Sequence, residues 1–169
     1  MKEDLIIKKE ISTPLGDMIC FASNKGICFL DFVDKKNYKE FDLKGESIDN
    51  KKDSKAYNHI KQLEIELAEY FEGKRKEFTL PLIPNGTDFQ KNVWDELLRI
   101  PYGKTISYKE EARRLKNEKA CRAVANANGK NKIAILIPCH RVIASDGSLG
   151  GYSGGLDKKE FLLALEKQS

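Results

Sequence analysis

The residues with the clearest chemical potential stand together in the run Pro138-Cys139-His140-Arg141. A cysteine thiol has an ordinary pKa of about 8.5, so it needs a base or a positive field to form a thiolate at neutral pH. An imidazole beside it can act as that base, directly or through a water, and a carboxylate behind the imidazole can fix its tautomer. A Cys-His pair alone also fits a buried, inert cysteine, so the surrounding residues must distinguish a reactive cysteine from an inert one.

The segments on either side of Cys139 must hold it in place. We predict that residues 133–137, which are all apolar, form a buried strand or extended run that ends at Pro138. Proline disfavours a helical backbone in the residue before it, which supports this prediction. Asp157 is predicted to cap a last helix over residues 158–166. The apolar face of that helix consists of Phe161, Leu162 and Leu165.

Three further helices are predicted upstream of Cys139. The run Thr87-Asp88-Phe89-Gln90 is a capping box that opens the first, which ends before Pro101. A second capping box, Ser107-Tyr108-Lys109-Glu110, opens a short helix to about residue 115, and a third helix covers residues 119–128. Two short helices joined by a tight turn are typical of a helix-turn-helix, although many helical hairpins share this spacing. The first helix is predicted to turn five apolar residues inward: Phe89, Val93, Trp94, Leu97 and Leu98.

The N-terminal part is predicted to be a small sheet with one helix. Residues 18–22 and 27–33 are apolar runs joined by a turn signal at residues 23–26, so they form a hairpin. Residues 38–55 are polar and aperiodic, and are predicted as loop or a weak strand. A helix follows from Ser54, and residues 78–82 could form another strand. The residues Pro81, Pro84, Asn85 and Gly86 then mark a connection between two parts of the chain.

We therefore predict an α+β protein with two domains. A small N-terminal sheet-plus-helix domain covers residues 1–86, and a mainly helical C-terminal domain with the helix-turn-helix covers residues 87–169. Hydrophobic residues make up 40% of the 169 and charged residues 33%, which excludes collagen-like, disordered and disulfide-framework proteins. No apolar run is long enough to span a bilayer, and the first residues do not resemble a signal peptide. We expect a cytoplasmic protein that has no membrane partner and whose cysteines are thiols.

The charge of the chain is unevenly distributed. The net charge is +4, and residues 103–142 hold ten basic residues against three acidic ones. A concentrated basic stretch in an otherwise balanced chain indicates a polyanion as partner. The alternative interpretation is a helical face that is simply solvated.

The residues around Cys139 favour one interpretation of these patterns. The run Ile135-Leu136-Ile137-Pro138-Cys139-His140-Arg141-Val142-Ile143 resembles the active-site signature of the O6-alkylguanine-DNA alkyltransferases, also called methylated-DNA–protein-cysteine methyltransferases. The resemblance covers about half of the chain, from Phe89 to Glu166. It includes the runs Cys121-Arg122-Ala123-Val124-Ala125 and Gly150-Gly151-Tyr152-Ser153-Gly154-Gly155-Leu156. The N-terminal half matches only loosely, around Thr13-Pro14-Leu15-Gly16.

This resemblance implies a single-turnover DNA repair reaction that needs no cofactor. Cys139 would accept the alkyl group from guanine O6 and would not be regenerated. His140 would deprotonate Cys139 through a bridging water, and Glu166 would orient His140. Asn131 would brace the turn that carries Cys139, and Tyr108 would donate a proton to guanine N3. The substrate pocket would be formed by Val142, Tyr152, Ser153 and Gly154.

The partner implied by the resemblance is double-stranded DNA with O6-alkylguanine, bound by a monomer through the minor groove. The reactive carbon lies within the stacked duplex, so the nucleotide must be rotated out, at a cost of a few kcal/mol. Arg122 would fill the gap as a finger, although it could instead contact a phosphate or point to solvent. The small residues Ala123 and Ala127 would let their helix approach a narrow groove, or would equally suit tight packing. Further DNA contacts are implied for Ser107, Tyr108 and Lys119.

The sequence departs from the family pattern at some positions, and two other classes of function are also compatible with it. Ala134 stands where many relatives carry proline, so the range of alkyl sizes is open. Some members bind zinc in the N-terminal part, but here the candidate ligands are only Cys20, Cys28 and His59, and we predict no metal. A non-catalytic binder of alkylated DNA or helix-turn-helix regulator is one alternative, against which the presence of Cys139 argues. A Cys-His-Glu hydrolase is the other, but the sequence shows no motif for an oxyanion hole.

Overall fold

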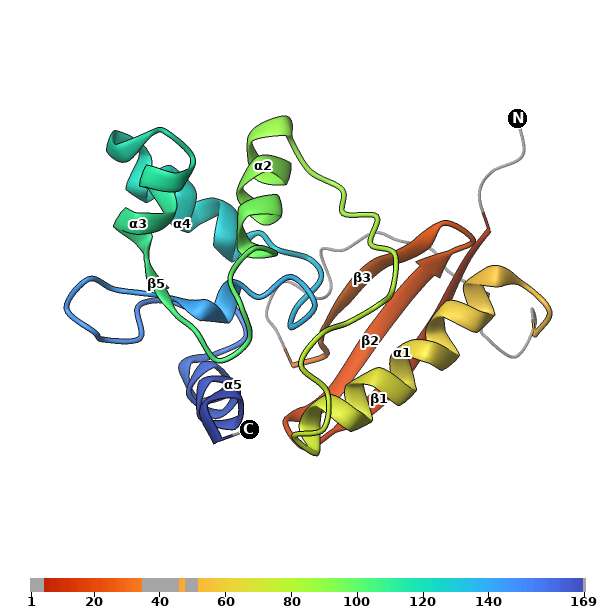
Figure 1. The fold of residues 1–169 in the computed structure, drawn as a ribbon. Coiled ribbons are helices and arrows are strands. Elements are labelled where there is room, and N and C mark those ends of the chain that lie inside the picture. Colours follow the sequence, from red (N-terminus) through yellow and green to blue (C-terminus); the bar gives the residue numbers. More distant parts are fainter. Residues whose placement is uncertain (1–4, 35–45, 48–51, 169) are drawn as a thin grey trace. The chain divides into compact units, whose positions relative to one another are not determined.

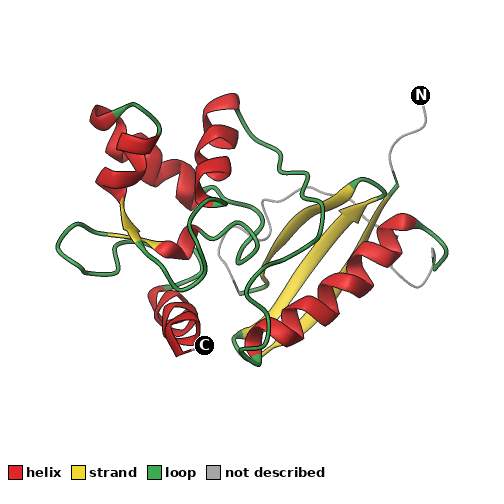
Figure 2. Cartoon of the chain, viewed as in Figure 1, coloured by secondary structure: helices red, strands yellow, loops and turns green. Residues whose placement is uncertain are grey.

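The computed structural model describes residues 5–34, 46–47 and 52–168. The chain divides into two compact units, Met1–Pro84 and Asn85–Ser169, within the connection Pro84-Asn85-Gly86. The longer strands belong to the first unit and most helices to the second (Figure 2). The predicted α+β class, with a sheet-plus-helix domain followed by a mainly helical domain, is confirmed.

The N-terminal unit is built on a sheet with the strand order β3-β2-β1-β4 (Figure 1). β2 (Gly16–Ser23) and β3 (Gly26–Phe32) are antiparallel, which confirms the predicted hairpin. β1 (Ile6–Thr13) pairs antiparallel with β2 and parallel with the short β4 (Glu46–Ser47). Most of the stretch 38–55, predicted as loop or weak strand, lies outside the described residues. β1 is not predicted from the sequence, because Ile7 and Ile11 are its only buried residues, too few to show the period of a strand.

The helix α1 (Lys55–Phe71) packs against the three long strands. Its apolar stripe of Ile60, Leu63 and Leu67 is fully buried, as the helical spacing predicts. The Ser54 hydroxyl accepts a hydrogen bond from the backbone N–H of Tyr57 and so caps the helix start.

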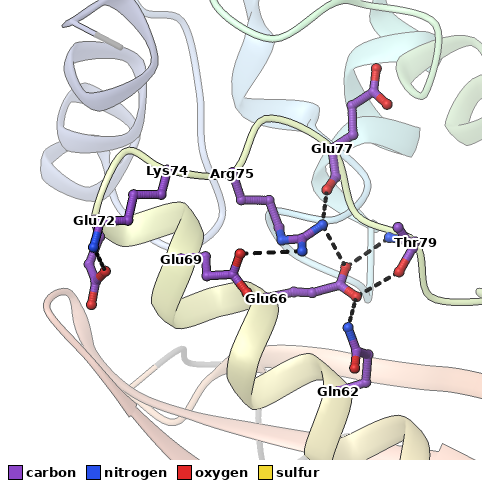
Figure 3. Close-up of polar contacts among 8 residues, drawn as sticks. All are labelled: Gln62, Glu66, Glu69, Glu72, Lys74, Arg75, Glu77 and Thr79. Atoms are coloured by element: carbon purple, nitrogen blue, oxygen red, sulfur yellow. Dashed lines mark hydrogen bonds and ion pairs between the residues drawn. The ribbon is translucent and has the colours of Figure 1, made fainter.

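The segment after α1 is attached to the helix by the buried carboxylate of Glu66 (Figure 3). The carboxylate accepts hydrogen bonds from the backbone N–H and the hydroxyl of Thr79, at 2.8 and 2.7 Å, and from Gln62 at 2.7 Å. Arg75 lies 3.8 Å away and pairs with Glu69 at 3.3 Å. The prediction of a strand over residues 78–82 is therefore wrong. Glu66 takes the Thr79 N–H, and only an isolated bridge between Ile27 and Leu82 reaches the sheet.

The C-terminal unit consists mainly of short helices around a two-stranded parallel ladder (Figure 1). Its elements are α2 (Asp88–Leu97), β5 (Ile106–Ser107), α3 (Tyr108–Arg114), the 3-10 turn Glu118–Ala120, α4 (Cys121–Gly129), the 3-10 turn Cys139–Arg141, β6 (Val142–Ile143) and α5 (Leu156–Gln168). The third predicted helix thus begins as a 3-10 turn and continues as α4. α5 already begins at Leu156, so Asp157 lies in its first turn and does not cap it.

The capping predictions for α2 and α3 hold to different degrees. Both hydrogen bonds of the capping box are formed at Thr87 and Gln90. Ser107 caps α3 by accepting from the N–H of Glu110, but the Glu110 carboxylate pairs with two arginines instead of reaching back. The inward face of α2 was predicted too broadly. Val93, Trp94 and Leu97 are buried, whereas Phe89 and Leu98 are 40% and 48% exposed because they flank that stripe at the two helix ends.

Residues 133–137 are buried as predicted, but they do not form a strand. The chain folds back on itself, with the N–H of Ile137 donating to the carbonyl of Ile133 at 3.0 Å and Ile135 at φ +72°. The side chain of Asn131 accepts from the N–H of Ile133 at 3.0 Å and donates to the carbonyl of Ile137 at 2.8 Å. These bonds replace the ladder that a partner strand would supply, so the segment is a compact turn leading into Cys139.

Within the described ranges, no helix is long and apolar enough to cross a membrane.

Candidate active site

Cys139 lies at the end of the turn that Asn131 organises. Its side chain is buried, with 8% of the residue exposed. The Asn131 amide Nδ2 donates to the Cys139 sulfur at 3.4 Å and to the carbonyl of Ile137 at 2.8 Å. The same amide group thus contacts both the sulfur and the backbone of the turn that carries it. The predicted bracing position of Asn131 is therefore present, with the sulfur included among its partners.

His140, Arg141 and Glu166 form a buried cluster next to Cys139. His140 Nε2 lies 2.6 Å from Glu166 Oε2. Arg141 donates from Nε to Glu166 Oε1 at 2.7 Å, and a second guanidinium nitrogen donates to Oε2 at 3.2 Å. The backbone N–H of Gly103 adds a longer hydrogen bond of 3.3 Å to the same carboxylate. Glu166 therefore joins α5 to the 3-10 turn that carries the Cys-His pair.

The charges in this cluster determine the protonation state of the His140 imidazole and which ring nitrogen carries the proton. Burial alone would raise the pKa of Glu166, but hydrogen bonds and charges from His140 and Arg141 outweigh it and lower the pKa to about 2. Burial lowers the pKa of His140, although its hydrogen bond to Glu166 opposes that change. A neutral imidazole beside an ionised carboxylate carries its proton on Nε2, so Nδ1 keeps a lone pair. Nδ1 is buried and has no hydrogen-bond partner among the residues that the structure describes.

A pocket of about 450 Å³ opens beside the Cys139 side chain. Of the predicted catalytic and pocket residues, four line it: Tyr108, Cys139, Tyr152 and Ser153. The other five do not: Asn131, His140, Val142, Gly154 and Glu166. Val142 is fully buried in β6. The remaining lining residues are Ala125, Asn126, Asn128, Gly129 and Gly151.

Tyr108 is positioned by the loop that precedes α5. Its hydroxyl lies 3.4 Å from the carbonyl of Gly151. Gly150 has φ +70°, and a Cβ there would approach the Tyr108 ring to 2.8 Å, so glycine leaves the room that the ring needs. Burial raises the pKa of Tyr108, with a smaller contribution from the charge of Cys139. The phenol is therefore protonated at neutral pH and can donate a hydrogen bond into the pocket.

Lys159 is a site residue that the sequence analysis missed. It is fully buried, and its ammonium donates to the carbonyls of Val142 at 2.6 Å and Gly151 at 2.9 Å. Burial lowers its pKa to about 8, while the charge of Cys139 acts in the opposite direction. Helical spacing could have revealed it, because Lys159, Leu162 and Glu166 lie on one face of α5. A lysine in a surface helix is otherwise expected to be solvated.

The residues predicted to meet DNA divide between two environments. Arg122 and Ala123, in the first turn of α4, are exposed, and so is Lys119 before it. Ser107 is half-buried and is occupied as the cap of α3. Ala127 is turned to the interior, where its carbonyl accepts a hydrogen bond from the indole N–H of Trp94 at 2.9 Å.

The structure also places the candidate zinc ligands of the N-terminal unit. Cys20 is fully buried in β2, and burial raises the pKa of its thiol far above the usual range. His59 lies on α1, where Nε2 is 3.2 Å from the carbonyl oxygen of Asn24. Across the described parts of the chain, no group of three or more His, Cys, Asp or Glu side chains could hold a metal ion.

Comparison with known families assigns both units to one class of protein. Residues 6–84 match the family described as "6-O-methylguanine DNA methyltransferase, ribonuclease-like domain". Residues 88–168 match "6-O-methylguanine DNA methyltransferase, DNA binding domain". The chain belongs to the 6-O-methylguanine DNA methyltransferase family, which confirms the resemblance seen in the sequence.

Individual relatives agree with this assignment over nearly the whole chain. The methylated-DNA–protein-cysteine methyltransferase of Methanosarcina barkeri is 46% identical over 159 residues, covering 94% of this chain and 96% of the relative. The crystal structure of the Mycobacterium tuberculosis O6-methylguanine methyltransferase is 37% identical, with a TM-score of 0.83, and the match covers 97% of this chain and 94% of that one. The Mycobacterium tuberculosis protein OGT in complex with DNA is 38% identical, with a TM-score of 0.81, covering 95% and 92% of the two chains.

Proposed function

We propose that this protein repairs DNA by transferring the alkyl group of O6-alkylguanine to the sulfur of Cys139. The observation that carries the proposal is the position of Cys139. Its sulfur is hydrogen-bonded by Asn131, its side chain lines a pocket, and the next residue, His140, pairs with Glu166. In the reaction a bond forms between sulfur and the alkyl carbon while the bond from that carbon to guanine O6 breaks. The thioether is not cleaved again, so each protein molecule repairs one lesion.

His140 is the proposed acceptor of the thiol proton. Its Nδ1 is the ring nitrogen with a free lone pair, because Nε2 is held by Glu166. A water between Nδ1 and the sulfur would pass the proton from Cys139 to the imidazole. The Glu166 carboxylate then stabilises the imidazolium that forms.

Tyr108 is the proposed donor to the leaving guanine. Breaking the bond at O6 leaves negative charge on the base, and a proton given to N3 makes guanine a better leaving group. The raised pKa of Tyr108 keeps the phenol protonated until that moment. The proton that His140 has taken balances the one that Tyr108 gives, so the net products are the neutral base and the thioether.

The DNA duplex is proposed to bind along α4 through its minor groove. The target nucleotide must leave the stack to reach the pocket, and exposed Arg122 can occupy the gap. Ala123 beside it is small enough for close approach, and Lys119 offers a charge to the phosphate backbone. α3 and α4 would then act as a helix-turn-helix. We propose that the protein acts as a monomer, because a single chain supplies the nucleophile Cys139, the base His140 and the proton donor Tyr108.

Transfer of label from a duplex with labelled O6-methylguanine tests the proposed reaction. Label should move to the peptide that contains Cys139, with one equivalent per protein and no turnover. Cys139→Ser should abolish transfer and keep duplex binding, whereas Cys121→Ser, the matched change near Arg122, should keep transfer. Continued turnover on acyl substrates would indicate the hydrolase instead, and duplex binding without transfer in the unmodified protein would indicate a non-catalytic binder.

Comparing a duplex with the free base tests the role of Arg122. Arg122→Ala should slow repair of the duplex about tenfold or more, because losing about 1.4 kcal/mol of the few kcal/mol needed to extrude a nucleotide has that effect. The reaction with free O6-benzylguanine should be nearly unchanged, since no duplex has to be opened. Equal loss on both substrates would instead assign Arg122 a packing role.

A further inference from the structure

Glu111 is a buried carboxyl group that the proposed reaction does not use. It lies on α3 and is fully buried, facing Asn128 of α4, which is 6% exposed. The two helices pack against each other (Figure 1). Asn128 lines the pocket beside Cys139, so this contact lies directly behind the proposed active site.

The contact between the two side chains is only half satisfied. Asn128 Nδ2 donates to Glu111 Oε1 at 2.7 Å. The other oxygen of each group, Glu111 Oε2 and Asn128 Oδ1, is buried without a hydrogen-bond partner among the described residues. As long as the carboxyl group is ionised, both of these oxygens are hydrogen-bond acceptors, so neither can donate a hydrogen bond to the other. A buried acceptor without a partner costs about 1–3 kcal/mol.

A proton on Glu111 Oε2, directed at Asn128 Oδ1, would give both atoms a partner. A neutral carboxylic acid and a primary amide can form a ring of two hydrogen bonds, in which the acid accepts from the amide N–H and donates to the amide oxygen. We propose that Glu111 is held as the neutral acid in a two-bond pair with Asn128, and that this pair makes Glu111 a positioning residue for the pocket wall. The pair fixes α4, which carries Arg122, against α3, which carries Tyr108.

The electrostatic surroundings of Glu111 support the neutral state. Burial and, as a smaller cause, the negative charge of Glu96 on α2 together raise its pKa to about 7, against the opposing effect of the Asn128 hydrogen bond. The titratable group that faces it from its own helix is Tyr108, whose pKa an ionised Glu111 would raise. Ionisation of Glu111 would therefore break the second hydrogen bond and add a negative charge that interacts unfavourably with Glu96.

Only the expected effect of the Glu111–Asn128 pair on alkyl transfer rests on the proposed function. Infrared difference spectroscopy of the whole protein tests the pair by itself. At pH 6 the spectrum should contain the C=O band of a buried protonated carboxyl group, and Glu111→Gln should remove it. If that band is absent, or is unchanged in the variant, the inference is overturned whether or not the protein transfers alkyl groups.

Stability measured against pH provides the second test. A folded-state pKa of about 7 lies above the ordinary value of 4.5, so stability should fall as the pH rises from 4.5 to about 7 and then level off. Glu111→Gln can form the same ring at any pH, so its melting temperature should lack this fall and exceed that of the unmodified protein at pH 8. Glu111→Leu removes the pair and should be less stable than Glu111→Gln at every pH. The matched change Glu110→Gln, on the same helix, should leave the fall in place, because the pKa of Glu110 is lowered to about 2.

The rate of alkyl transfer tests the positioning role. The ratio of the unmodified rate to the Glu111→Gln rate should be near one at pH 6. It should fall about tenfold by pH 8, where a group with a pKa of about 7 is about 90% ionised. Both proteins react faster at higher pH because more Cys139 is present as thiolate, and taking the ratio of the two rates removes this shared effect. A ratio that is constant from pH 6 to 8, in a protein whose transfer still depends on Cys139, would overturn the positioning role and leave the proposed function intact.

Discussion

Replacing Glu166 by glutamine removes the negative charge of the side chain and keeps its size, so it tests what the charge contributes to stability and to the rate of alkyl transfer. In the native cluster the carboxylate accepts from His140 at 2.6 Å and from Arg141 at 2.7 Å. A glutamine side chain has one oxygen and one NH₂ group, so it cannot accept from both neighbours. If the NH₂ group faces His140, it donates to Nε2 and moves the imidazole proton to Nδ1. If it faces Arg141, two donors oppose each other in a buried site.

The expected loss of stability follows from the pKa of Glu166. The pKa of Glu166 falls from 4.5 to about 2 on folding, and a tenfold change in the ionisation equilibrium corresponds to about 1.4 kcal/mol. Glu166→Gln should therefore lower the free energy of unfolding at pH 7 by about 3 kcal/mol. Because the folded pKa is depressed, this stabilisation is complete above pH 4.5 and is lost as the pH falls toward 2. The variant should lack that part of the acid dependence in urea titrations.

The expected loss of rate follows from the tautomer. With its proton on Nδ1, the imidazole cannot take the thiol proton, and general base catalysis contributes about 10²–10⁴ in rate. Single-turnover transfer at pH 7 should therefore slow about a hundredfold or more. The rate should recover as the pH approaches the ordinary thiol pKa of about 8.5, because the thiolate then forms without a base.

A matched control lies on the same helix. Glu160 is an exposed residue of α5, so Glu160→Gln should change neither stability nor rate appreciably. If Glu166→Gln transfers the alkyl group at the unmodified rate at pH 7, with an unchanged pH profile, the assigned role of Glu166 is refuted. Loss of stability with an unchanged rate would limit Glu166 to a structural role.

Two more substitutions test residues that the sequence patterns do not reveal. Lys159→Met removes a cation whose charge interacts with Cys139, so the pKa of Cys139 should rise. Iodoacetamide alkylation followed against pH measures that shift, and an unmoved profile would exclude the electrostatic role. Glu66→Gln leaves Arg75 and Thr79 without the full set of acceptors and should cost about 1–3 kcal/mol in urea unfolding. Glu69→Gln, at a side chain that is 37% exposed, should cost less than about 1 kcal/mol, and equal losses would contradict the special role of Glu66.

Local interactions explain which elements the sequence predicted well. The Thr87 capping box, the β2–β3 hairpin and the buried stripe of α1 each depend on residues only a few positions apart. Such short-range patterns are visible without knowledge of the fold. β1 was missed because its burial pattern is sparse, and residues 78–82 were misassigned because their hydrogen bonds go to Glu66 on α1, a contact that no local pattern encodes.

The sequence by itself determined the family, the reacting cysteine and its neighbouring histidine as candidates, and the order of a sheet domain and a helical domain. Only the tertiary structure decided which charged residues are buried and what they contact. The family resemblance implied that Glu166 orients His140 and that Asn131 braces the turn. The fold shows in addition that Glu166 accepts from Arg141 and that Asn131 replaces a strand partner for the turn before Cys139. Lys159 and Glu111 look like solvated surface residues in the sequence, because burying a charge is unfavourable unless the fold supplies partners. Those partners come from distant segments, so only the folded chain shows them.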